Sequence, residues 1–236
     1  MEWVTIKNCG CYALVRNGQG GNITKDLLEN MVIEFARISS KFYEAVSEFP
    51  FVYSEKQMGS VLIPALLNSA DAVFQEQPAI RKLKGKKENY GWIDYWVLSR
   101  NITFLIELKQ HGFSANAQNV NAGAQNKWSK AIDQIKSIKK SEAQDLTIGN
   151  KACKVALQIM PIWQHGSDND SLALEILPKE DVGKFLMTSR KELNPQPHWS
   201  AVWYLHDTLQ KEPQEYDGWF RYPGVMFHAY WEMVEL

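Results

Sequence analysis

Cysteine, net charge and long apolar runs are all scarce in this chain of 236 residues. The three cysteines (Cys9, Cys11 and Cys153) form no Cys-x-x-Cys pair, which argues against a disulfide framework and a zinc site. No run approaches the roughly 18 apolar residues of a membrane span, and the first residues do not resemble a signal peptide. We therefore expect a cytoplasmic protein with reduced thiols and no membrane association.

The charge balance and several missing motifs exclude further classes. Lys and Arg total 26 against 27 Asp and Glu, so no overall positive charge points to nucleic acid. The histidines show no His-Glu-x-x-His spacing, and the chain has no Gly-x-Ser-x-Gly elbow. A zinc hydrolase and a serine hydrolase of the α/β type are therefore disfavoured. A hydrophobic content of 45% is ordinary for a folded protein, and the length suits a single domain.

Hydrophobic periodicity predicts alternating helices and strands. The predicted helices cover residues 24–49, 54–69, 127–140 and 178–187, and the predicted strands cover 72–81, 91–99, 102–110, 152–160, 199–205 and 225–234. The short link at 99–101 favours an antiparallel hairpin. The strand–helix–strand step after residue 102 requires a crossover and implies a parallel pair. The order indicates an α/β fold with a mixed central sheet flanked by helices.

Charged residues interrupt two of these apolar strands. Asp94 is the one charged residue between Trp92 and Leu98, and Glu107 and Lys109 lie on one face of the next strand. Across a hairpin, Asp94 lies near Glu107, and two close carboxylates need a compensating cation. A hard divalent ion such as Mg²⁺ suits oxygen ligands. The alternative is an ion pair of Lys109 with Asp94 or Glu107 on a half-exposed sheet.

This pattern, Asp94 followed by Glu107-Leu108-Lys109, resembles the PD-(D/E)XK nuclease superfamily, which has the restriction-endonuclease-like fold. The resemblance covers residues 54–160, where the predicted order is helix, three-strand meander, helix, strand. It implies that Asp94, Glu107 and the Leu108 carbonyl bind Mg²⁺ or Mn²⁺. It also implies that Lys109 assists the attacking water. Ile93 departs from the motif, which has Pro before the Asp.

Two positions on helices extend the resemblance. An acid on the first helix of the core often completes such a site, and Glu55 is the best-placed match. Glu34, Glu44 and Glu48, on the preceding helix, are weaker rivals. Gln134 could match the polar residue that some members carry on the second helix. We expect a single domain over 1–236, in which a helical extension (1–53) and a C-terminal aromatic β extension (161–236) flank the core.

Basic residues gather in two segments near the proposed site. We predict phosphate-backbone contacts for the following residues: Arg81, Lys82, Lys84, Lys86, Lys87, Lys127 and Lys130. The alternative for residues 81–87 is a solvated loop.

The sequence favours a Mg²⁺-dependent nuclease acting on DNA, with Glu55, Asp94, Glu107 and Lys109 as its catalytic residues. The alternative is a non-catalytic module on the same fold that binds nucleic acid or assembles with proteins. The aromatic, acidic segment 211–236 supports this alternative, because it could form a homodimer or partner interface.

Overall fold

A computed structural model describes residues 1–16, 21–82, 88–166, 175–210, 214–215 and 219–235. Its strands form one mixed, ten-stranded sheet. The strands are β1 (Trp3–Ile6), β2 (Gly10–Arg16), β3 (Ala72–Arg81), β4 (Asn89–Ser99), β5 (Ile102–Gln110), β6 (Phe113–Ser114), β7 (Lys151–Gly166), β8 (Trp199–Leu205), β9 (Gln214–Glu215) and β10 (Trp219–Val234). Their order is β1-β2-β8-β10-β7-β5-β4-β3, with β6 beside β7 and β9 beside β10.

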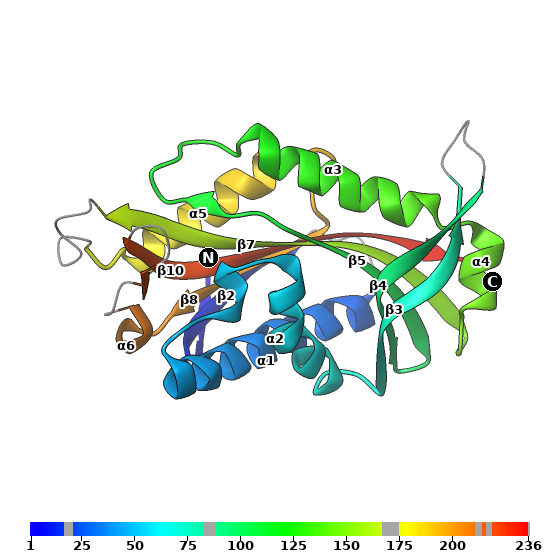
Figure 1. Ribbon diagram of the computed structural model, residues 1–236, viewed down its shortest axis with the longest axis horizontal. Coiled ribbons are helices and arrows are strands. Elements are labelled where there is room, and N and C mark those ends of the chain that lie inside the picture. The colour runs from blue at the N-terminus through cyan, green and yellow to red at the C-terminus, as the bar shows by residue number, and fades with distance from the viewer. Residues whose placement is uncertain (17–20, 83–87, 167–174, 211–213, 216–218, 236) are drawn as a thin grey trace.

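Helices cover both faces of this sheet (Figure 1). One face carries α1 (Asn22–Val46) and α2 (Glu55–Leu67), and the other carries α3 (Ala122–Ser137) and α5 (Lys179–Glu192). The remaining helical segments are short: η1 (Pro50–Val52), α4 (Lys140–Asp145) and α6 (Asp207–Gln210). None of the described helices is long and apolar enough to cross a membrane.

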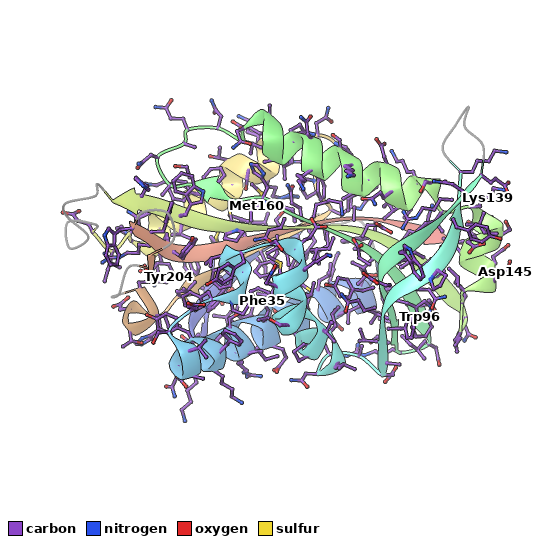
Figure 2. The ribbon with its side chains drawn as sticks, viewed as in Figure 1. Phe35, Trp96, Lys139, Asp145, Met160 and Tyr204 are labelled. Atoms are coloured by element: carbon purple, nitrogen blue, oxygen red, sulfur yellow. The ribbon has the colours of Figure 1, made fainter. Side chains whose placement is uncertain are left out.

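Two apolar layers hold the helices against the sheet. Phe35 lies in the larger core beneath α1 and α2, and Met160 lies in the opposite core, against α5 (Figure 2). Strand β5 is buried along all but its last residue, which explains its almost continuous apolar sequence. Charged residues in such a strand lose their hydration, so they require partners within the protein.

The strand pairing around β5 agrees with the sequence predictions. Strands β4 and β5 form an antiparallel hairpin, and β5 pairs with β7 in parallel. The predicted bounds of β3 and β5 match the observed ones, whereas β7 and β10 are each longer than predicted. Helix α3 begins five residues before the predicted start, where the Asn121 side chain accepts a hydrogen bond from the Ala124 N–H at 2.8 Å.

The two predicted extensions are parts of the sheet itself. The N-terminal segment, which we expected to be helical, contains the hairpin of β1 and β2 before α1. Within the segment 161–236, β8 pairs with β2, and β10 lies between β8 and β7. The N-terminal hairpin and the C-terminal strands therefore belong to the same continuous sheet as β3, β4, β5 and β7.

Candidate active site

The pairing of β4 with β5 stops next to the acidic residues. The last paired residues are Tyr95 and Ile106, one step before Asp94 and Glu107 would face each other. Beyond this point the Leu108 N–H has no ladder partner on β4 and donates to Asp94 Oδ2 at 2.7 Å. The carboxylate of Asp94 thus replaces a backbone acceptor and is held at the place where the two strands separate.

Lys109 connects three elements through its ammonium group. Its Nζ lies 3.1 Å from Glu55 Oε1 and 3.6 Å from Asp94 Oδ2, and it donates to the Leu108 carbonyl. The Lys109 side chain is only 7% exposed, so these oxygens replace the water that a surface ammonium would bind. Helix α2, β4 and β5 therefore each contribute an oxygen around one buried cation.

Glu55 begins α2, and its carboxylate ties the helix to the end of β5. While Oε1 contacts Lys109, Oε2 accepts a hydrogen bond from the Gln110 N–H at 3.1 Å. A carboxylate in the first turn also interacts favourably with the helix dipole. The rival acids lie elsewhere: Glu34 pairs with Arg37, and Glu48 accepts a hydrogen bond from Tyr53.

Glu107 has a different cation for its partner. Its Oε1 accepts a hydrogen bond from the Arg81 guanidinium, and its Oε2 is buried without a hydrogen-bond partner. Burial and the nearby Asp94 carboxylate raise the pKa of Glu107 to about 7, against the opposing effect of Arg81. Burial also raises the pKa of Asp94, although Lys109 opposes this shift. The site therefore holds two carboxyl groups that bind protons more readily than usual.

Arg81 differs from its predicted role as a phosphate contact in a basic loop. It ends β3, is 8% exposed, and also donates to the carbonyls of Trp92 and of Gln134 on α3. Its charge is thus directed into the protein, because the buried Glu107 carboxylate needs a counter-ion. Gln134 contributes its backbone carbonyl here, while its side-chain oxygen is buried without a partner.

The other predicted phosphate contacts fall into two groups. Lys82, Lys127 and Lys130 are exposed, as a role in binding phosphates requires. Lys84, Lys86 and Lys87 lie outside the described residues.

A small cavity of about 150 Å³ opens beside Asp94. Glu55, Leu108 and Glu76 also line it. Sequence reasoning missed Glu76, which lies opposite Asp94 in β3 with a left-handed φ of 56°. In the sequence, the available signal was the polar triplet Gln75-Glu76-Gln77 within a strand. In the structure, a left-handed φ at a non-glycine residue often marks a functional irregularity.

The predicted metal ligands are close in the fold but have separate partners. Within the described ranges, no three His, Cys, Asp or Glu side chains are already arranged to hold a metal ion. Asp94 and the Leu108 carbonyl contact the Lys109 ammonium, whereas Glu107 contacts Arg81. Two cations of the protein therefore already contact most of the oxygen atoms that the resemblance assigns to Mg²⁺, whereas Glu107 Oε2 has no partner.

Comparisons with family models, curated proteins and solved structures found no match to this chain. The geometry and charges of the site are therefore the basis for a function.

Proposed function

We propose that this protein is a metal-dependent nuclease that hydrolyses DNA phosphodiester bonds on a restriction-endonuclease-like core. The observation that supports this most directly is the buried Lys109 ammonium, surrounded by oxygens from α2, β4 and β5 beside a cavity. A simple surface ion pair would need neither the burial nor the third oxygen.

The donor atoms are suited to Mg²⁺ or Mn²⁺. Carboxylate and carbonyl oxygens are the ligands that hard divalent cations prefer, and Asp94, Glu55 and the Leu108 carbonyl supply them around one position. The unpartnered Oε2 of Glu107 adds a buried oxygen that no group of the protein satisfies. Asp94, Glu107 and Leu108 would hold the ion, and Glu55 would complete the set.

Each residue has a separate task in the proposed hydrolysis. A bound Mg²⁺ would polarise a phosphoryl oxygen and lower the pKa of a water molecule. Lys109 offsets the negative charge that develops on the phosphate, because its ammonium is desolvated and held in place. Asp94 fixes the Leu108 N–H, and so orients the carbonyl and the lysine that follow it. Glu55 fixes the position of Lys109 relative to α2.

A second candidate function has one specific observation in its favour. The Arg81 guanidinium already neutralises Glu107, as it would in a site that needs no metal. The alternative is thus a non-catalytic module that binds nucleic acid or assembles with a protein through the aromatic, acidic segment 211–236.

The test is DNA cleavage with and without Mg²⁺, using single-stranded and duplex substrates. We expect Asp94→Asn and Lys109→Ala each to reduce the cleavage rate at least about 100-fold while the protein stays folded. The matched controls are Asp181→Asn and Lys184→Ala, which remove an exposed ion pair of 2.7 Å on α5 and should leave the rate unchanged. Cleavage that persists in both site variants would refute the assignment.

A further inference from the structure

A larger groove shares the first turn of α2 with the small cavity at Asp94. Its volume is about 680 Å³, within the range of about 300–1,000 Å³ that is typical of small-molecule sites. Residues from the η1–α2 segment, the end of β5, β7 and β10 line it. None of the candidate catalytic residues except Glu55 lines this groove, so its lining requires a separate explanation.

Aromatic rings form one wall of the groove. Trp163 of β7 and Phe220 of β10 are both partly exposed, and their rings make an edge-to-face contact with centroids 5.8 Å apart. Tyr222 lines the same wall and makes an edge-to-face contact with Phe51. Partly exposed, fixed rings in a concave site provide the surface on which planar ligands stack.

A glycine allows the Trp163 indole to lie close to the backbone. A Cβ atom on Gly112 would lie 3.0 Å from Trp163 Nε1 and 3.1 Å from its Cδ1, closer than an ordinary contact. An alanine at this position would therefore push the indole by a few tenths of an ångström. Residue 112 thus offers a way to move the ring without removing it.

The groove also carries positive charge. Among the described residues that line it, Lys56 and Lys127 are exposed, and Glu55 is the one acid. The Glu55 carboxylate is already engaged by Lys109 and by the Gln110 N–H. An anionic ligand with a planar ring would therefore meet both lysines and the aromatic wall in the same groove.

The two cavities meet at the start of α2. Glu55 and Lys56 line both the groove and the small cavity at Asp94. A DNA strand with a phosphate at the Asp94 cavity would pass Lys56 on entering the groove, because this lysine lines both.

We propose that the groove binds one unpaired DNA nucleotide next to the phosphate that is cut, with its base against Trp163 and Phe220. This inference depends on the proposed nuclease function. A base in a duplex is stacked and paired on both sides, so it must leave the stack before it can enter a groove of this kind. The site therefore selects single-stranded DNA or frayed ends over intact duplex.

The test measures binding in EDTA, where cleavage does not interfere. The probes are a fluorescein-labelled oligothymidylate and a blunt duplex of the same length, followed by anisotropy. We expect Trp163→Ala to weaken binding of the single strand about 5- to 100-fold and to change duplex binding less than about twofold. Trp163→Phe should retain most of the affinity, because a ring remains for stacking.

Two further variants separate stacking from general damage. Gly112→Ala, which crowds the indole by a few tenths of an ångström, should weaken single-strand binding less than Trp163→Ala and leave duplex binding unchanged. Trp3→Ala is the matched control, because Trp3 is a partly buried tryptophan that lines a different cavity, of about 500 Å³. It should change neither affinity.

An abasic site moved along the single strand locates the bound nucleotide. We expect one position at which the missing base weakens binding by the wild type but not by Trp163→Ala. Equal losses for single strand and duplex, or no loss in either, would overturn the inference. A wild type that binds as expected but cleaves nothing with Mg²⁺ would overturn the proposed nuclease function and leave the groove assignment standing.

Discussion

Two polar clusters on the same sheet, one partly buried and one fully buried, contrast in their charge and in whether every hydrogen bond is made. In the first, Lys109 and Arg81 pair with three carboxyl groups, those of Glu55, Asp94 and Glu107, where β4 separates from β5. In the second, His228 of β10 lies between Ser189 and Ser200, and both imidazole nitrogens have hydroxyl partners at 3.0 and 2.9 Å.

Burial shifts the pKa values of the two clusters in opposite directions. It lowers the pKa of His228 to about 3, so the ring stays neutral, with both nitrogens satisfied. It raises the pKa of Glu107 to about 7 and leaves one of its oxygens without a partner. A neutral cluster in which every polar atom has a hydrogen-bond partner costs little free energy to bury. Buried charges and a carboxylate oxygen without a partner lower the stability of the fold, and such groups are typical of functional sites.

The largest expected effect concerns the Arg81–Glu107 pair. Arg81→Met should lower the free energy of unfolding by about 3–5 kcal/mol, because it leaves the Glu107 carboxylate buried without a counter-ion. Urea unfolding measures this loss. Adding Glu107→Leu should recover most of the stability, since the pair is then replaced by apolar groups. If Arg81→Met alone were as stable as the wild type, the buried Glu107 carboxyl group would not require Arg81 as a counter-ion.

The second effect is a pH dependence that originates at His228. Its pKa is about 3 in the folded protein and near 6.5 in the unfolded chain, so the unfolded chain binds more protons between these values. Stability from this group is complete above pH 6.5 and is lost as the pH falls. Between pH 6.5 and 5 the wild type should lose about 2 kcal/mol more than His228→Asn, which does not titrate. Urea unfolding at each pH measures the free energy of unfolding. Equal losses for the wild type and His228→Asn over this pH range would contradict the prediction.

The smallest effect concerns competition for the oxygens around Lys109. Removing the ammonium in Lys109→Met should tighten Mn²⁺ binding roughly tenfold, because the ion no longer competes with a resident cation. Calorimetry measures this, and Lys184→Met serves as the control. Weaker binding by Lys109→Met would mean that the lysine supports the metal instead of competing with it.

The sequence predicted the elements around the charged cluster well. Strand β5 is buried on both faces, so its apolar run and its embedded charges were visible without a structure. The separation of β4 from β5 at Asp94 was not predictable, because it depends on where a ladder stops and not on residue type. The pairing of Arg81 with Glu107 was missed for a similar reason: a basic run in the sequence does not show which of its members turns inward.

The second cluster gave almost no signal in the sequence. Ser189, Ser200 and His228 come from α5, β8 and β10: β8 pairs with β10, and α5 packs against both strands. The aromatic groove was missed likewise, because Trp163 lies in the part of β7 beyond its predicted end. Contacts within one hairpin can be predicted from spacing, whereas contacts among three distant elements depend on sheet order.

The position of β10 sets an order of assembly. This strand is made after every other described strand, yet it joins β7 to β8 in the middle of the sheet. During synthesis, the strand ladder between β8 and β7 therefore cannot be completed until residues 219–234 have emerged, although α1 can already pack against β1 and α2. Until then β7 and β8 each lack the neighbour that covers their edge, and uncovered strand edges are where chains pair wrongly.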